Sequence, residues 1–370
     1  MLAISGITIA LIVLLPASPR APREDAARPP HTEPGLEPGA TAPQISENGA
    51  AEPARIQGAE AEPATETGIL SAYDLPTDWE PPHATGQLLG TLDAAGTPSD
   101  AVRSITGAGP DRDNQKARRA AINELTVNLA SDDVAALIEF LLVPHDEDSG
   151  VSRTIYNVLR NDVLEVLVRQ DTMPDGLGGL MVAMLRNPEE DSVWRDYSMQ
   201  YMAEYYRRRW VPESDIEYDP AGRDERLQML AAFRDAFNQT EDTLAGTALI
   251  GFEALARHYP EIDAAEAAAS ALRIAGEQQM SAASRLTALR ICATLGEQQV
   301  LSTARQLAQI GETTPLRMAA IATLGDLGST DDLPLLNALS GAAEPGIARI
   351  ATAARTRLAE KTAQKQQDQS

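Results

Sequence analysis

The stretch PLRMAAIATLGDLGSTDDLPLLNALSGAAE, residues 315–344, decides the fold. On each side of its central GSTDD, apolar residues recur at the three- and four-residue intervals of an amphipathic helix. The glycine at position 328 is typical of a left-handed residue that ends a helix, and Asp331 or Asp332 would cap the helix that follows. The stretch therefore predicts a helix, a turn and a second helix.

The same pattern recurs on both sides of this stretch, in SRLTALRICATLGEQQVLSTARQLAQIGE (284–312) and GIARIATAARTRLAE (346–360). Gly296 ends the first helix of the earlier copy as Gly328 does in the later one. An arginine recurs in one register at intervals of 32 residues: Arg285, Arg317 and Arg349. A single helical pair cannot bury its apolar face alone, so consecutive pairs are expected to stack into an α-solenoid.

Looser copies of the pair precede these, beginning near residue 113. Arg153 and Arg195 each follow a valine by two positions and are interpreted as earlier members of the arginine register. The pattern predicts six helical pairs and a final capping helix. We expect each repeated arginine to pair with an acidic residue of an adjacent turn.

This arrangement resembles the HEAT-like repeats of the phycobilisome-lyase type, which occur in many bacterial proteins. The resemblance covers residues 113–360 and is strongest in the unit that begins at Leu316, where V/L-R-x-x-A, LG-x-x and LPxL follow in order. It implies an all-α solenoid whose work is to bind proteins or bound cofactors. Some members of the family act as chromophore lyases, but the repeat itself carries no universal catalytic residue.

The first residues of the chain, 1–17, predict a membrane anchor or a signal segment. No charge occurs from Leu2 to Leu15, a stretch shorter than the roughly 20 residues of a full span. We favour an uncleaved anchor because Pro19 and Pro22 follow the small residues at which a signal would be cleaved. The expected location is membrane-anchored at the cell envelope, with the periplasmic side favoured, and secretion after cleavage is the alternative.

Composition divides the rest of the chain. Residues 18–70 are rich in Pro, Ala and Glu and poor in large apolar residues, which predicts a disordered linker. Residues 71–112 regain apolar residues and are interpreted as loops with short helices, one of them over 99–106. The solenoid is expected over 113–360, and a polar tail over 361–370.

Charge and residue counts exclude several classes of function. The chain has 31 Lys and Arg against 54 Asp and Glu, a net charge of −23, which argues against nucleic acid as a partner. The single cysteine excludes an internal disulfide and a Cys-type zinc site, and four histidines leave little for a His-based one. We therefore expect no metal site, no cofactor, no catalytic residue and no enzymatic activity.

The stretch WRDYSMQYMAEYYRRRW, residues 194–210, is the candidate partner-binding site. Aromatic residues and arginine are enriched at binding hot spots. The residues predicted to border the site are Tyr206, Arg207, Arg208, Arg209 and Trp210. In the alternative interpretation, the tyrosines pack in the core and the arginines complement the dipole at a helix C-terminus.

The sequence thus favours a membrane-anchored, protein-binding scaffold or assembly factor that uses an α-solenoid surface. Two alternatives stay open. One is an accessory subunit or enzyme of the chromophore-lyase type, and the other is a structural spacer of the envelope. The identity of the protein partner is not indicated by any motif.

Overall fold

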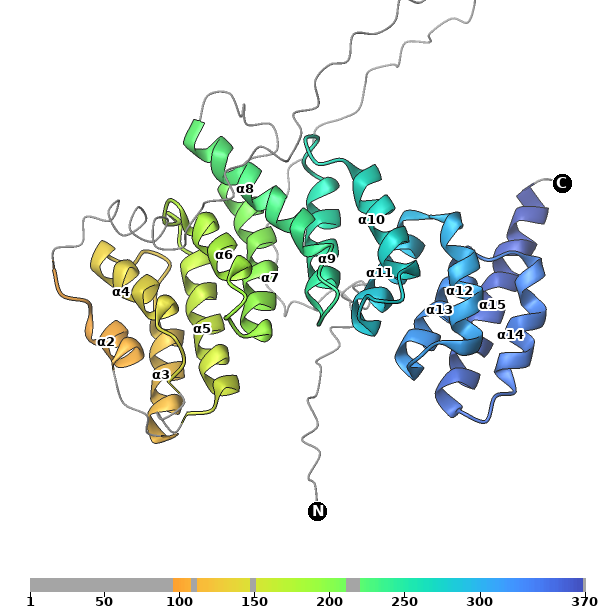
Figure 1. The fold of residues 1–370 in the computed structure, drawn as a ribbon, viewed down its shortest axis with the longest axis horizontal. Coiled ribbons are helices and arrows are strands. Elements are labelled where there is room, and N and C mark those ends of the chain that lie inside the picture. The colour runs from red at the N-terminus through yellow and green to blue at the C-terminus, as the bar shows by residue number, and fades with distance from the viewer. Residues whose placement is uncertain (1–95, 108–111, 147–150, 211–219, 369–370) are drawn as a thin grey trace, which may run out of the picture. The chain divides into compact units, whose positions relative to one another are not determined.

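The computed structural model describes residues 96–107, 112–146, 151–210 and 220–368, and all regular structure in these ranges is helical (Figure 1). The predicted segments 1–17 and 18–70 lie outside the described residues. The last helix continues through most of the predicted polar tail. The helices are α2 (Asp100–Thr106), α3 (Arg112–Glu124), α4 (Ser131–Leu142), α5 (Arg153–Val168), α6 (Leu177–Arg186), α7 (Ser192–Arg209), α8 (Pro220–Ala236), α9 (Leu244–Ala256), α10 (Ala264–Gly276), α11 (Ala282–Leu295), α12 (Leu301–Ile310), α13 (Thr314–Leu327), α14 (Leu333–Ser340) and α15 (Pro345–Asp368).

The helices from α3 onward form an α-solenoid, as the sequence predicted. Six consecutive pairs run from α3 with α4 to α13 with α14, and α15 covers the last pair. The first helices of successive pairs pack directly on one another, from α7 through α9 and α11 to α13 (Figure 1). In the C-terminal half, each second helix packs most closely on the first helix of the next pair. The pairs therefore interlock along the stack.

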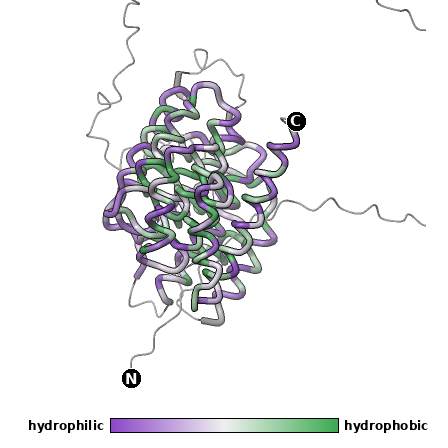
Figure 2. Tube along the Cα trace, turned by 90° about the vertical axis from the view of Figure 1, so that its right-hand side faces the viewer, coloured by the Kyte–Doolittle hydropathy of each residue, from purple (hydrophilic) through white to green (hydrophobic). Residues whose placement is uncertain are grey.

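The core runs through the whole stack between the helices. Viewed from one end, hydrophobic residues concentrate in the middle and hydrophilic residues lie outside (Figure 2). Trp194, Phe233 and Phe252 are among its largest fully buried side chains. Each fully buried side chain of this kind stabilises the fold by about 1.5–3 kcal/mol. Cys292 is also fully buried, and burial raises the pKa of its thiol to about 12.

The two turn glycines end their helices differently. Gly296 adopts the predicted left-handed conformation, with φ of 79°. Gly328 does not, because its φ is −62°, and the prediction of a left-handed residue was wrong there. An added Cβ at Gly328 would lie 2.3 Å from the carbonyl oxygen of Leu324. Glycine is thus required at position 328 by close approach of the backbone.

Asp332 is the N-cap residue of α14, as predicted, but its side chain makes no capping hydrogen bond to that helix. Ser329, rather than an aspartate, caps the turn, and its hydroxyl accepts a hydrogen bond from Asp331 N at 3.3 Å. The carboxylate of Asp332 accepts from Ser329 N at 3.0 Å in return. Asp332 also binds Arg305 of α12 at 2.6 Å, so this side chain joins α12 to the capped turn before α14.

The short helix expected over 99–106 is present as α2, with Ser99 as its N-cap. It packs on α3 and α4 and closes this end of the described stack. The backbone ahead of it is held by α4, because Gly96 N donates to Asp132 and Ser99 N donates to Asp133. Within the described ranges, no helix has both the length and the hydropathy needed to cross a bilayer.

Candidate functional site

The repeated arginines join neighbouring helical pairs. Arg285 lies four residues after Ser281, the N-cap of α11, and binds Glu312 in the turn between α12 and α13 at 2.6 Å. Arg317 stands in the same position after Thr313 and binds Glu344 at 2.9 Å. Each also donates through Nε to a carbonyl oxygen at the end of the preceding helix. These arginines therefore pair with acidic residues of the next turn and stabilise the stack.

The other three arginines of the predicted register are placed less regularly. Arg195 follows its N-cap Asp191 by four residues and donates to Leu185 O at 2.9 Å. Arg153 is instead the first residue of α5, where Tyr156 occupies the repeated position, and it lies 4.0 Å from Asp191. Arg349 is exposed and falls one residue late, because Ala348 N makes the bond to Glu344 O that marks this position.

The aromatic part of the predicted partner site lies in the core. Tyr206 is fully buried and Trp210 is 6% exposed, with ring centroids 4.9 Å apart. Tyr259 packs edge-on against Tyr206 at 4.9 Å and donates its hydroxyl to Trp210 O at 2.9 Å. The guanidinium of Arg226 lies 5.4 Å from the rings of both Tyr206 and Trp210. The rings of Tyr206 and Trp210 are therefore buried and do not form part of the exposed surface.

The tyrosine hydroxyl belongs to a buried polar network. Tyr206 donates to Glu261 at 3.1 Å and accepts from Arg226 Nε at 3.3 Å, and Arg226 also forms an ion pair with Glu261. Burial raises the pKa of Tyr206 to about 12, so the ring is neutral at physiological pH. The network fixes the C-terminal end of α7 against the loop that follows α9.

The arginine part of the predicted site reaches the surface. Arg207 and Arg208 are exposed, and Arg209 is 33% exposed. Arg207 pairs with Glu204 on its own helix. Arg208 donates to the carbonyl oxygens of Arg169 and Gln170 at the C-terminus of α5, and Arg209 binds Asp175 at 2.9 Å. The run thus satisfies acceptors of the preceding pair while keeping two of its guanidinium groups accessible.

The rest of the tyrosine stripe packs as the alternative interpretation expected. Trp194 and Tyr205 are fully buried, and Tyr197 and Tyr201 are half-buried against the core. Tyr205 donates to the carboxylate of Glu225 on α8 at 3.2 Å. The stripe is therefore part of the contact of α7 with its neighbours.

Glu225 is a half-buried carboxylate that the sequence did not single out. It accepts from Gly178 N at 2.9 Å and Gly179 N at 3.3 Å, and so caps the N-terminus of α6 from a neighbouring helix. Gly176, the N-cap residue of α6, has no side chain that could do this. Burial raises the pKa of Glu225, although the bonds from Gly179, Tyr205 and Gly178 oppose the rise. The signal in the sequence was the stretch GLGG at 176–179, which offers no polar side chain to cap α6.

We expect Glu225→Gln to gain stability relative to the native chain as the pH rises. The raised pKa means that Glu225 favours the folded state most below its ordinary pKa, and that this contribution is lost as the pH rises through the folded pKa. Glutamine carries no charge and keeps an acceptor for Gly178 N. Urea unfolding of both chains over a series of pH values measures the difference, with the exposed Glu360→Gln as control. A difference that does not vary with pH would contradict the expectation.

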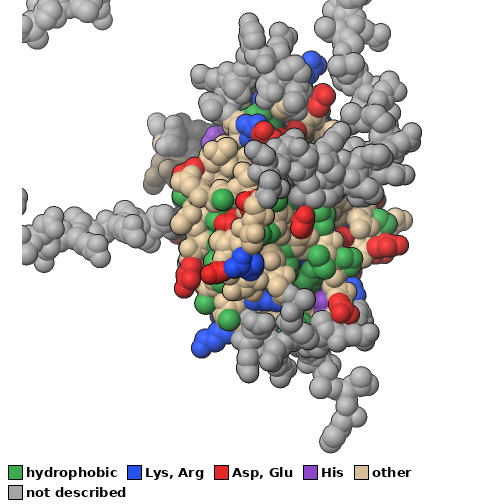
Figure 3. Space-filling view, turned by 90° about the vertical axis from the view of Figure 1, so that its left-hand side faces the viewer, with side chains coloured by type: hydrophobic (Ala, Val, Ile, Leu, Met, Phe, Trp, Pro, Cys, Tyr) green, Lys and Arg blue, Asp and Glu red, His purple; other side chains and the backbone are tan. Residues whose placement is uncertain are grey.

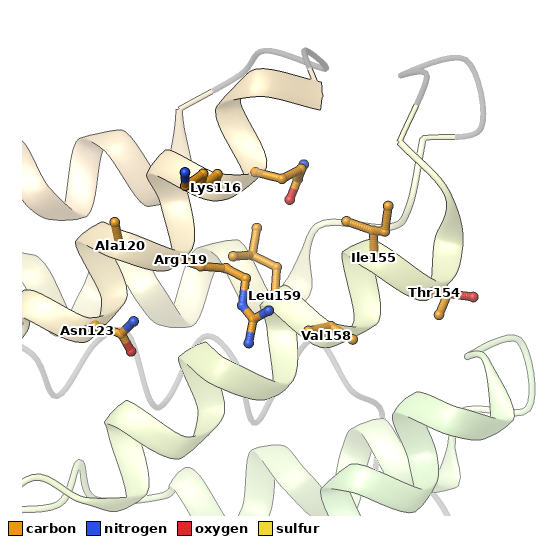
Figure 4. A pocket seen from close by; sticks show the side chains of 9 residues that line it. Lys116, Arg119, Ala120, Asn123, Thr154, Ile155, Val158 and Leu159 are labelled. Atoms are coloured by element: carbon orange, nitrogen blue, oxygen red, sulfur yellow. The ribbon is translucent and has the colours of Figure 1, made fainter. Parts of the chain in front are cut away.

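A groove lies between α3 and α5, near the end of the stack that α2 closes. Its volume is about 720 Å³, within the range of roughly 300–1,000 Å³ of ligand pockets. Lys116, Arg119 and Asn123 line it from α3, and Ile155 and Val158 line it from α5 (Figure 4). The signal that the sequence offered was Lys116, one of only three lysines in the chain, with Lys361 and Lys365.

The helices beside the groove approach one another less closely than later first helices do. Between α9 and α11, Gly246 lies against the backbone of Ser284, and between α13 and α15, Gly325 lies against Ala354. The α3 face has long polar side chains instead, including Lys116 and Arg119. At this end of the stack, acidic and basic side chains are interspersed with apolar ones (Figure 3). The groove is therefore explained by the long side chains on α3, which take the place of the glycines that let later helices pack closely.

The described residues contain no group of three or more His, Cys, Asp or Glu side chains that could hold a metal ion. Among the histidines, His145 places Nε2 2.8 Å from Val151 O and packs on Tyr156. This ring therefore has a structural role in the turn between α4 and α5.

Comparison with known proteins identifies HEAT repeats over residues 269–355, from within α10 into α15. No curated protein matches the chain. The matched residues include the segment from which the sequence predicted the repeat. This part of the chain is therefore similar to HEAT repeats.

Proposed function

We propose that this protein is a binding scaffold or assembly factor whose α-solenoid holds a protein partner. The observation that carries the proposal is the match to HEAT repeats, which commonly mediate protein interactions. Stacked helical pairs give an extended surface, and their loops and exposed helix faces can vary without loss of the core. The repeat favours a scaffold over an enzyme.

The exposed arginines at the C-terminal end of α7 are the first candidate for the partner surface. Arg207 and Arg208 are exposed in a strongly acidic chain, and Arg209 lies beside them. The rigid cluster of Tyr206 and Trp210 beneath them holds the helix end in place. A fixed backbone lowers the entropic cost of presenting long side chains to a partner.

Charge reversal at Arg207, Arg208 and Arg209 is expected to lower partner recovery at least tenfold, because an acidic partner contact would become repulsive. Tagged full-length protein is crosslinked in the cells that make it, and partners are recovered and quantified by mass spectrometry. A matched variant reverses Arg103, Arg290 and Arg349, which changes the net charge equally. Unchanged recovery from a folded triple variant would overturn the role of the arginines. Failure to recover any reproducible partner with the native chain would count against the scaffold.

We further propose that residues 1–17 anchor the protein at the cell envelope and that residues 18–70 act as a spacer. The support is the uncharged run from Leu2 to Leu15 and the proline-rich composition that follows. An extended proline-rich chain spans about 3 Å per residue, so the spacer would reach on the order of 100 Å.

Deletion of residues 2–17 is expected to move the protein from the membrane fraction to the soluble fraction. The same deletion leaves every described helix intact, so far-UV circular dichroism of the remaining chain checks its fold. A high-salt wash distinguishes an inserted segment from electrostatic association. Native protein found in the soluble fraction would refute the anchor, and native protein found outside the cell would favour secretion.

A further inference from the structure

We infer that the groove between α3 and α5 binds a short acidic segment of a protein partner, in which a carboxylate stands beside apolar side chains. The inference rests on the proposed scaffold function and names a second contact surface for it. It places this contact far along the chain from the arginines at the end of α7.

Donors without acceptors gather on the α3 side of the groove. Lys116 is exposed, and within the described residues its amine has no carboxylate partner. Arg119 uses Nε to bind Asp162 at 3.0 Å, which leaves its terminal nitrogens as donors. Gln115 Nε2 is buried in the groove wall and has no acceptor among the described residues. A buried donor of this kind gains a hydrogen bond when an acceptor enters.

The α5 side of the groove is apolar. Ile155 is 39% exposed, whereas the valine and leucine side chains of α5 are buried or half-buried. Val158 and Leu159 continue the same wall toward the interior (Figure 4). Removing such side chains from water favours binding by about 25 cal/mol per Å². An occupant therefore needs apolar side chains toward α5 and acceptors toward α3.

The charge and size of the groove select the occupant. Among the described residues no acidic side chain lines it, although the whole chain carries a net charge of −23. Carboxylates accept hydrogen bonds and offer no donor, so they match the lysine, arginine and amide donors. The lining runs from Gln115 to Asn123, which at 1.5 Å per residue is about 12 Å. That length fits two helical turns or a few extended residues of a peptide.

The test places a photoreactive benzoylphenylalanine at Ile155 of the full-length protein in the cells that make it. The matched control carries the same residue at Ile250, which is 52% exposed on α9. We expect a crosslinked adduct from position 155 and not from position 250, with the captured peptide containing Asp or Glu next to apolar residues. Lys116→Glu is expected to lower the adduct yield at least tenfold, whereas Arg290→Glu leaves it unchanged.

The following results would contradict the proposed contact in the groove. Capture of a basic peptide, of a segment of this same chain or of a second copy would overturn the inference. A partner recovered by the full-length chain without an adduct at position 155 would overturn the groove while leaving the scaffold function standing. Because Lys116 is exposed and makes no ion pair within the described residues, its substitution tests binding without removing a structural contact.

Discussion

Replacing Arg160 with alanine is expected to lower the free energy of unfolding by about 3–5 kcal/mol, because removing one partner of a buried ion pair leaves the other without compensation. Arg160 lies in α5 and its side chain is 2% exposed. Its two terminal nitrogens bind Glu190 at 3.0 and 3.1 Å, and Nη2 also donates to Leu141 O at 2.6 Å. The Arg160 side chain thus joins α5 to α4 and to the turn between α6 and α7.

The ring of Trp194 strengthens this site further. The guanidinium carbon of Arg160 lies 4.1 Å from the Trp194 ring, a cation–π contact between α5 and α7. Such contacts contribute about 2 kcal/mol or more when they are shielded from water. Alanine would leave a cavity beside the indole, an unpaired carboxylate at Glu190 and an unpaired carbonyl at Leu141.

The measurement is urea unfolding followed by far-UV circular dichroism and tryptophan fluorescence. Arg169→Ala is the matched control, because Arg169 follows the same helix, is 66% exposed and pairs only with Glu165 in the described ion pairs. Exposed pairs of this type contribute about 0.5 kcal/mol or less. Equal losses for the two variants would show that burial of Arg160 is not what stabilises the junction.

The helical periodicity predicted the fold because the solenoid is built from local signals. Each pair has its own apolar stripe, cap and turn, so the segment 315–344 contained the information for a whole unit. Arg195, Arg285 and Arg317 of the expected register each lie four residues after the N-cap of their helix. Arg153 and Arg349 take other positions in their helices, because a valine or glycine nearby does not fix where a helix begins.

The contacts that define the candidate sites depend on residues far apart in the chain. Glu190 lies 30 residues after Arg160, and Glu261 lies 55 residues after Tyr206, so no local pattern indicates either bond. The stretch 194–210 showed where aromatic and basic residues concentrate, but burial separates Tyr206 and Trp210 from the exposed arginines. The groove was missed because its walls come from two helices, and the rare Lys116 on one of them does not indicate what lies opposite.

Gly325→Ala is expected to destabilise the C-terminal end of the stack by about 3 kcal/mol, at the upper end of overpacking effects. An added Cβ at position 325 of α13 would lie 2.7 Å from both Cα and Cβ of Ala354 on α15. Because Cα belongs to the backbone, no side-chain rotation relieves the clash, and α15 must shift as a unit. Hydrogen exchange at α13, α14 and α15 is expected to quicken before exchange in the earlier pairs.

Gly179→Ala separates this clash from the general effect of removing a glycine from a helix. Apart from the neighbouring backbone of α6 itself, nothing lies within 4 Å of a Cβ built at Gly179, so alanine there is expected to stabilise α6 by about 0.5–1 kcal/mol. The two substitutions are chemically the same and should act with opposite signs. Since α15 covers the last apolar face of the solenoid, its displacement in Gly325→Ala exposes Leu324 and Leu336 to water and should promote self-association at high concentration. A Gly325→Ala chain as stable as the native one would mean that α13 and α15 do not meet at this glycine in solution.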